Sequence, residues 1–274
     1  MTQSPLADRV IAIAESRELD VFAALLERRG AHVLRYPLIS IADAPDPVPV
    51  LDWLRRFSAG ACDDLILLTG EGLRRLLGCC ERHDPSLREA FVTALARTRR
   101  VTRGPKPARV LRQLGLAPDI EAAIPTTSGV IEALRAFDLR GRRVGVQLYG
   151  GEPNPPLMEF LEEAGAQALP VAPYVYGDAM ADDAVRELLQ MMANGNVDAI
   201  AFTSKAQVER LFKVGPEDLV RTALGKAQVA AVGPVVAEAL RSRRVEVQAM
   251  PEASWFMKPL ASELVALLEE RSPT

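Results

Sequence analysis

The sequence predicts an α/β protein of two similar lobes, each a parallel sheet flanked by helices. Short apolar, β-prone runs alternate with stretches of helical periodicity, and three of these runs recur in the same order in the second half of the chain. Such alternation is typical of parallel sheets with helices on both faces. The chain has 274 residues, 49% hydrophobic and 25% charged, which is enough for two globular domains.

The first repeat is a strand followed by a helix. Residues 9–14 (RVIAIA) predict a strand, and the helical pattern after them ends before Gly30. Residues 143–148 (RVGVQL) repeat the strand, and the helical pattern after them ends before Gly165. Extended chain follows in both copies, so the two segments predict the same βα unit.

Two further repeats follow in the same order. Residues 64–70 (DLILLTG) predict a buried strand running into a loop and a helix, and residues 198–204 (DAIAFTS) repeat this pattern. Residues 104–108 (GPKPA) and 233–237 (GPVVA) each follow a short strand and start a helix, where a proline in the first turn is favourable. The chain is therefore predicted to be a duplication.

The duplication leaves two arrangements open. Each repeat can fold as its own lobe, or the repeats can exchange their first βα units. In the second case the extended stretches 34–41 and 169–176 are the two crossings between lobes. Each stretch carries proline and tyrosine, which suits a linker.

Candidate binding residues follow the predicted strands. Ligands of parallel α/β sheets bind beyond the carboxyl ends of the strands, where the N–H groups of helix N-termini suit carboxylates or phosphates. The sharper expectation is that all these loops face one cleft between the lobes. N-capping is the alternative for the hydroxyl residues. The candidates are Ser16, Arg17, Thr69, Gly70, Lys106, Tyr149, Asn154, Thr203, Ser204, Lys205, Gly233 and Pro234.

Composition and missing motifs argue against several function classes. The net charge of −3 gives no reason to expect nucleic-acid or membrane binding. Two histidines and three cysteines (Cys62, Cys79 and Cys80) lack metal-ligand spacing, so we expect no metal and reduced thiols in a core. The polar start predicts a cytoplasmic protein. Dinucleotide, Walker A and nucleophile-elbow motifs are absent, so no cofactor is expected.

At these loops the chain resembles the uroporphyrinogen-III synthase family. The similarity runs over roughly residues 9 to 270. The residues that carry it are DAIAFTS at 198–204, AAVGP at 230–234 with Ala237 and Leu240, Leu148-Tyr149, the stretch 165–174, and RGPKPARVLRQLGL at 103–116.

The resemblance implies a fold in which the first βα unit belongs with the C-terminal lobe. A two-stranded β linker then joins the lobes, with a cleft between them. The predicted boundaries are 1–37 plus 175–274 for one lobe, 43–168 for the other, and 38–42 and 169–174 for the linker strands.

The resemblance also implies the reaction. The linear tetrapyrrole hydroxymethylbilane loses water and closes with inversion of its last pyrrole ring, without metal or cofactor. The small-molecule substrate is the expected partner, and the protein is expected to be a monomer. The family's tyrosine corresponds to Tyr174, the predicted catalytic proton donor. Tyr36 stands at the matching place of the first repeat, so a pair of structural tyrosines is the alternative.

The sequence departs from the family pattern at three helix starts. Glu15-Ser16-Arg17 stands where the family often has Thr-Arg-Pro, and Pro107 and Val236 replace threonines. Hydroxyls that could touch substrate are therefore missing. The rival interpretation is a non-catalytic tetrapyrrole-binding or regulatory protein that keeps the fold.

Overall fold

The computed structural model describes residues 4–150 and 152–269. The chain divides into two compact units, each an α/β fold. Unit 1 comprises residues 1–40 and 177–274, and unit 2 comprises residues 41–176. No helix within the described ranges is long and apolar enough to cross a membrane.

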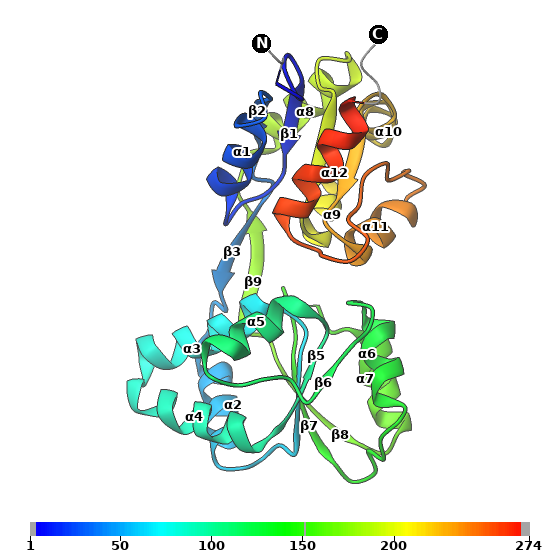
Figure 1. Cartoon of the computed structure of the whole chain (residues 1–274). Coiled ribbons are helices and arrows are strands. Elements are labelled where there is room, and N and C mark those ends of the chain that lie inside the picture. The colour runs from blue at the N-terminus through cyan, green and yellow to red at the C-terminus, as the bar shows by residue number, and fades with distance from the viewer. Residues whose placement is uncertain (1–3, 151, 270–274) are drawn as a thin grey trace. The chain divides into compact units, whose positions relative to one another are not determined.

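Unit 2 is a five-stranded parallel sheet between two layers of helices. Its strands are β4 (Asp64–Leu67), β5 (Arg99–Thr102), β6 (Ile120–Glu121), β7 (Arg143–Gln147) and β8 (Gln167–Val171). Its helices are α2 (Val48–Ser58), α3 (Gly70–His83), α4 (Pro85–Arg97), α5 (Pro105–Gln113), α6 (Thr127–Leu134) and α7 (Pro155–Glu163). The strand order is β6-β5-β4-β7-β8. Helices α2 to α5 pack together on one face, and α6 and α7 pack together on the other (Figure 1).

Unit 1 is a parallel sheet of four strands built in the same way. Its strands are β1 (Val10–Ile13), β2 (His32–Arg35), β10 (Ala199–Phe202) and β11 (Gln228–Ala231). Its helices are α1 (Leu19–Glu27), α8 (Asp182–Ala193), α9 (Lys205–Val214), α10 (Glu217–Lys226), α11 (Pro234–Arg241) and α12 (Met257–Glu269). The strand order is β11-β10-β1-β2. Helices α8 to α11 are neighbours, and α1 contacts α12.

The two sheets have corresponding strand orders. β10 and β11 of unit 1 match β4 and β5 of unit 2, and β1 and β2 match β7 and β8. A parallel bridge between Ala230 and Ala249 stands where β5 pairs with β6 in unit 2. β1 pairs with β10 and β2, so the first βα unit completes the sheet made by the second half of the chain.

Both passages between the units lie in a separate pair of strands. These are β3 (Ile39–Asp43) and β9 (Tyr174–Asp178), which form a two-stranded sheet. The predicted second linker strand, 169–174, overlaps β8, which is the edge strand of the unit 2 sheet in register with β7. Leu169 and Val171 pack on the unit 2 core, which holds this segment in the unit. The second linker strand therefore starts later than predicted.

The amino-acid pattern explains how the helices start. β4 is buried at all four positions, and the hydroxyl of Thr69 just after it accepts the N–H of Gly72 at 2.9 Å, which caps α3. α5 and α11 begin with Pro105 and Pro234, whose missing N–H groups cost nothing in a first turn. Side chains that follow the strands are thereby placed at helix N-termini.

Each unit has its own hydrophobic core. One continuous cluster fills unit 1, whereas two clusters lie in unit 2. In unit 2 the ring of Trp53 stacks on Phe57 with centroids 5.1 Å apart, and Phe57 packs against Phe91 at 5.3 Å. The Trp53 indole N–H also donates to the carbonyl of Leu169 at 2.9 Å. This bond anchors β8 to α2, in keeping with its place in the sheet.

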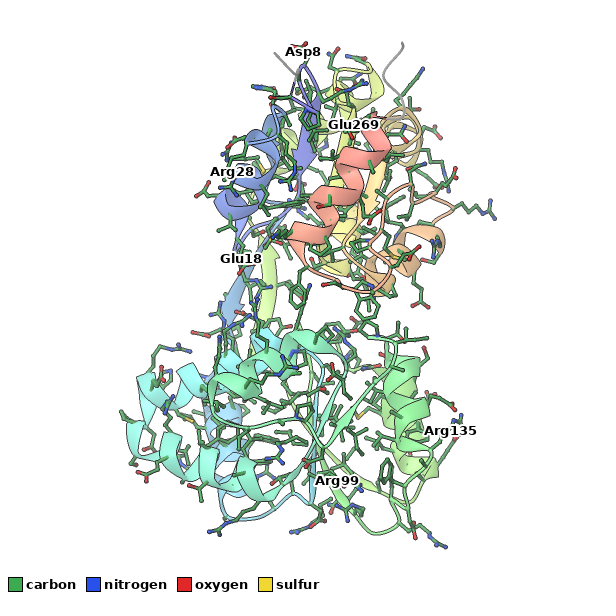
Figure 2. The ribbon with its side chains drawn as sticks, in the orientation of Figure 1. Asp8, Glu18, Arg28, Arg99, Arg135 and Glu269 are labelled. Carbon is green, nitrogen blue, oxygen red and sulfur yellow. The ribbon has the colours of Figure 1, made fainter. Side chains whose placement is uncertain are left out.

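A buried carboxylate joins three strands at the start of the unit 2 sheet. Asp64 is 1% exposed and forms ion pairs with Arg99 of β5 and with Arg142, just before β7. Figure 2 labels Arg99 in unit 2. Arg142 also donates from a second nitrogen at 3.1 Å. A buried charge with two cationic partners is costly to disturb, because removing one member leaves the others unpaired.

We predict that Asp64→Asn lowers the free energy of unfolding by about 3 kcal/mol, because two guanidinium groups lose their counter-charge. Urea unfolding followed by circular dichroism measures the effect. Asp138→Asn is the matched control, since the Asp138–Arg140 pair is exposed at 63% and 82%. The control should not change the midpoint measurably. Equal effects of the two substitutions would contradict the structural role of Asp64.

Candidate functional site

The carboxyl edge of unit 1 is organised around Glu15, which follows β1. The residue is 7% exposed. One carboxylate oxygen accepts the backbone N–H groups of Ser16 and Arg17, each at 2.9 Å, and lies 3.5 Å from that of Glu18. The other oxygen accepts a hydrogen bond from the hydroxyl of Thr203, which follows β10. The Glu15 side chain thus accepts hydrogen bonds from the backbone segment that leads into α1.

Glu15 is held in its charged form. Burial raises its pKa, but the hydrogen bonds from Thr203 and from the N–H groups of Arg17 and Ser16 lower it, and the net result is a pKa below the ordinary value of 4.5. The nearby Arg17 guanidinium acts in the same direction. A negative charge therefore resides at this edge at neutral pH.

Gln207 completes the arrangement beneath α9. The residue is 2% exposed, and its side-chain oxygen accepts the N–H groups of Thr203 at 2.7 Å and Ser204 at 3.1 Å. Its amide nitrogen donates to the Thr203 hydroxyl at 2.9 Å. Thr203 donates to Glu15 and accepts from Gln207, so its hydroxyl has no proton left for a ligand.

The other unit 1 candidates also have internal contacts. The Ser16 hydroxyl donates to the carbonyl of Ile39. Lys205 forms an ion pair with Glu209 at 3.2 Å, one turn further along α9. These two polar side chains are therefore already engaged within the unit.

The start of α11 is closely covered. A Cβ on Gly233 would lie 2.8 Å from the ring of Trp255, so only glycine fits there. Pro234 follows as the first residue of α11 and has no N–H to offer a ligand.

The carboxyl edge of unit 2 uses a neutral amide as its buried acceptor. Gln147, at the end of β7, is fully buried, and its side-chain oxygen accepts the N–H of Thr69 at 3.0 Å. Its amide nitrogen donates to the carbonyl of Leu148. Gly72 makes room for it, since a Cβ there would lie 1.9 Å from the Gln147 side chain.

Tyr174, the predicted proton donor, lies at this edge. Its hydroxyl oxygen is 3.3 Å from the hydroxyl of Thr69, and its ring makes an edge-to-face contact with Tyr176 at 5.6 Å. The residue is 1% exposed. Burial, and to a lesser degree Tyr176, raises the pKa of Tyr174 well above its ordinary value, against a small lowering by the Thr69 hydrogen bond. The phenol is protonated at neutral pH, and the raised pKa makes it a weaker acid than an ordinary tyrosine.

The carboxyl edge of unit 2 also carries a cation packed on an aromatic ring. The guanidinium of Arg103 lies over the ring of Tyr149, 4.9 Å from its centroid. Gly150, at φ 60°, packs so closely on Tyr176 that a Cβ would lie 2.2 Å from the ring. The loop after β7 can pack this closely on Tyr176 because Gly150 has no side chain.

The remaining unit 2 candidates differ in accessibility. Lys106 is exposed in the first turn of α5. Gly70 is buried, and a Cβ there would lie 2.7 Å from the Lys106 carbonyl oxygen. Asn154 is 5% exposed, has a left-handed backbone (φ 52°), and accepts the Thr127 hydroxyl at 3.4 Å. Of these three, only Lys106 presents a side chain to solvent.

Sequence comparison identifies the family. The family model for uroporphyrinogen-III synthase HemD matches residues 20–257. The chain belongs to the uroporphyrinogen-III synthase family.

The similarity to individual proteins extends over the whole chain. It is 32% identical to the uncharacterized protein YjjA of Bacillus subtilis over 97% of this chain and 98% of that protein. It is 26% identical to a putative uroporphyrinogen-III synthase of Methanothermobacter thermautotrophicus, over 90% and 93% of the two chains. A crystal structure of a mutant uroporphyrinogen III synthase from the extremely thermophilic bacterium Thermus thermophilus superposes with a TM-score of 0.77 at 29% identity, covering 96% and 100%.

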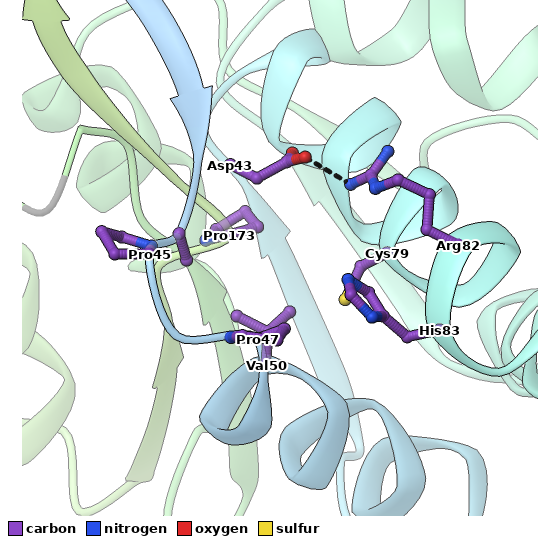
Figure 3. A pocket seen from close by; sticks show the side chains of 9 residues that line it. Asp43, Pro45, Pro47, Val50, Cys79, Arg82, His83 and Pro173 are labelled. Atoms are coloured by element: carbon purple, nitrogen blue, oxygen red, sulfur yellow. Dashed lines mark ion pairs between the residues drawn. The ribbon is translucent and has the colours of Figure 1, made fainter.

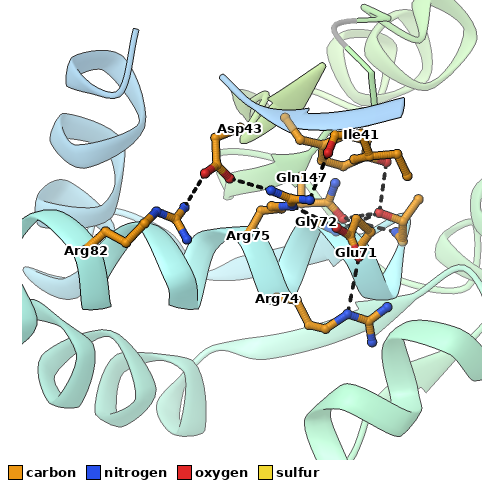
Figure 4. Close-up of polar contacts among 10 residues, drawn as sticks. Ile41, Asp43, Glu71, Gly72, Arg74, Arg75, Arg82 and Gln147 are labelled. Atoms are coloured by element: carbon orange, nitrogen blue, oxygen red, sulfur yellow. Dashed lines mark hydrogen bonds and ion pairs between the residues drawn. The ribbon is translucent and has the colours of Figure 1, made fainter. Parts of the chain in front are cut away.

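In this uroporphyrinogen-III synthase family member, arginines secure the linker strands to each unit. In unit 2, Arg75 of α3 pairs with Asp43 at 2.9 Å and donates to the Ile41 carbonyl at 3.0 Å, while Glu71 accepts from Arg75 at 2.7 Å (Figure 4). In unit 1, Arg210 of α9 is 5% exposed and pairs with Asp178 at the end of β9, at 3.1 Å. The corresponding helices α3 and α9 therefore hold the ends of β3 and β9, respectively.

A small pocket lies beside the Asp43 network, apart from the predicted site residues. It has a volume of about 170 Å³ and is lined by Asp43, Ala44, Pro45, Pro47, Val50, Cys79, Arg82, His83 and Pro173 (Figure 3). An ion pair of 2.8 Å between Arg82 and Asp43 crosses its rim. Burial raises the pKa of the Cys79 thiol, so this cysteine is a weak nucleophile. In the described part of the chain, no group of three or more His, Cys, Asp or Glu side chains is placed to hold a metal.

Sequence reasoning missed three buried acceptors: Glu15, Gln147 and Gln207. Two of them had a visible signal. Ser204 and Gln207 have the S-x-x-Q spacing of a capping box, and Gln147 is a polar residue in an otherwise apolar strand. The contacts of Glu15 depend on strand order, because Thr203 is distant in sequence, so a sequence pattern alone does not reveal them.

We predict that Glu15 stabilises the protein in a pH-dependent way. Its pKa is lowered by folding, so its contribution is full above about pH 4.5 and is lost as the pH falls through the folded-state pKa. Glu15→Gln should therefore cost about 2 kcal/mol of unfolding free energy at neutral pH, and the difference from wild type should narrow in acid. Urea titrations across this pH range measure it, with the exposed Glu132→Gln as control. A pH-independent difference would contradict this assignment.

Proposed function

We propose that the protein cyclises hydroxymethylbilane to uroporphyrinogen III, with loss of water and inversion of the last pyrrole ring. The observation that carries the proposal is the family match across residues 20–257. Similarity to the Thermus thermophilus enzyme over 96% of this chain supports it.

The Tyr174–Thr69 pair supports a role in acid assistance. Loss of hydroxide from a hydroxymethylpyrrole is helped by the pyrrole nitrogen and needs only a modest proton donor. The Tyr174 phenol carries a proton at neutral pH, and the Thr69 hydroxyl lies 3.3 Å away, where it can relay a hydrogen bond. Because Tyr174 is 1% exposed, the leaving hydroxyl must approach through a movement of the neighbouring loop or through Thr69.

Cations of unit 2 supply the attraction for the substrate, which carries eight carboxylates. Arg103 and Lys106 lie at and just after the end of β5, at the same edge as Tyr174. Arginine and lysine bind carboxylates through charge-assisted hydrogen bonds. Most of the remaining task is to fold the linear chain so that the substituted end of the last ring is attacked, which is a positioning effect.

A second candidate function is a tetrapyrrole-binding protein without catalytic activity. The observation that favours it is the internal use of the unit 1 hydroxyls, because Thr203 donates to Glu15 and Ser16 donates to Ile39. At this edge the Thr203 and Ser16 hydroxyl protons are therefore not available to assist the reaction.

A coupled assay separates the two functions. Hydroxymethylbilane is generated in situ, the products are oxidised to porphyrins, and the isomers are separated by chromatography. The enzyme should produce isomer III at a rate that scales with its concentration. Formation of isomer I alone, as in spontaneous closure, would reject catalysis.

We predict that Tyr174→Phe lowers turnover about 100-fold, because the proton donor is lost while the ring is kept. The rate of isomer III formation at saturating substrate measures this, and circular dichroism verifies folding. Tyr36→Phe is the matched control, since the Tyr36 hydroxyl donates to the weakly accepting Met191 sulfur, at 3.9 Å, in unit 1. Unchanged turnover in a folded Tyr174→Phe variant would remove Tyr174 from the mechanism.

A further inference from the structure

The arrangement around Glu15 has the form of an occupied carboxylate site. Its donors are two backbone N–H groups at 2.9 Å, those of Ser16 and Arg17, and the Thr203 hydroxyl from a different strand. The positive end of the α1 dipole and the Arg17 side chain add to them. A bound carboxylate would be satisfied by the same groups, and here the chain itself provides the carboxylate.

Unit 2 has no charged group at the matching register. β1 pairs with β10 as β7 pairs with β4, so Ile13 matches Gln147 and Glu15 matches Tyr149. Tyr149 lies under Arg103 and Gln147 is a neutral amide. Glu71, the acidic residue in the first turn of α3, pairs with Arg74 and Arg75. A carboxylate held by backbone N–H groups and a hydroxyl therefore distinguishes the unit 1 edge from the unit 2 edge.

We propose that Glu15 is a built-in carboxylate that occupies the anion position of unit 1 and thereby determines substrate specificity. A substrate group that lies over this edge cannot use the donors that Glu15 already occupies. A substrate carboxylate placed there would also be repelled by the Glu15 charge. This inference rests on the proposed function for the nature of the substrate, but the occupied site itself does not depend on catalysis.

Removing the side chain should create a site for an external carboxylate. In Glu15→Ala the same donors remain and formate is small enough to replace the lost group. The unfolding midpoint of this variant should rise in about 0.1 M sodium formate relative to equal sodium chloride, and the rise should level off as the site saturates. Formate should also shift the Ser16 and Arg17 amide signals in NMR spectra.

Wild type and Glu15→Gln are the matched controls. Both keep the position filled, the first with charge and the second without, so neither should respond to formate beyond the effect of chloride. If Glu15→Ala does not fold in chloride, formate should restore folding. A folded variant that ignores formate, or an unfolded one that formate does not rescue, would overturn the occupied site.

A kinetic measurement tests the effect on specificity. Glu15→Ala should lower KM for hydroxymethylbilane about tenfold, since a substrate carboxylate gains one charge-assisted contact. Formate should raise KM again in this variant and leave the wild-type KM unchanged. An unaltered, formate-insensitive KM would reject the specificity role. Failure of the proposed function is distinct, because wild type would then give no isomer III while the formate result would stand.

Discussion

A buried acceptor beside the loop that leads into a helix sets the charge of each sheet edge of this protein. The N–H groups at and just before a helix start need acceptors, and a parallel sheet brings several helix starts to one edge. Unit 1 meets the need with the carboxylate of Glu15 and the amide of Gln207. Unit 2 uses Gln147 and the Thr69 hydroxyl, both neutral. The same fold thus yields one edge with an internal negative charge and one whose buried acceptors are neutral.

Tyr174 and Tyr36 stand at matching places of the two repeats, but their hydroxyls have different partners. Tyr174 pairs with the Thr69 hydroxyl, whereas the Tyr36 hydroxyl reaches a methionine sulfur. Arg103 and Lys106 lie at the same edge of unit 2 as Tyr174.

Much of the fold could be predicted from sequence because buried parallel strands leave continuous apolar runs. The runs at 64–68 and 198–202 and the Gly-Pro helix starts place both sheets. The second linker strand was misplaced because β8 is a partly exposed edge strand with a proline, and it reads like extended linker. At the candidate site, the sequence predicted which loops follow the strands, but it did not predict the hydrogen-bond partners of the hydroxyl groups in those loops. Ser16, Thr69 and Thr203 look alike in sequence and differ in what they contact.

The asymmetry between the two edges is tested most directly by NMR titration with uroporphyrin III, the oxidised form of the proposed product. Backbone amides report which helix starts meet its carboxylates. The account predicts large shift changes at Arg103 and Lys106, and small ones at Ser16 to Glu18, where Glu15 already occupies the donors. Comparable changes at Ser16 to Glu18 in the wild-type protein would contradict it.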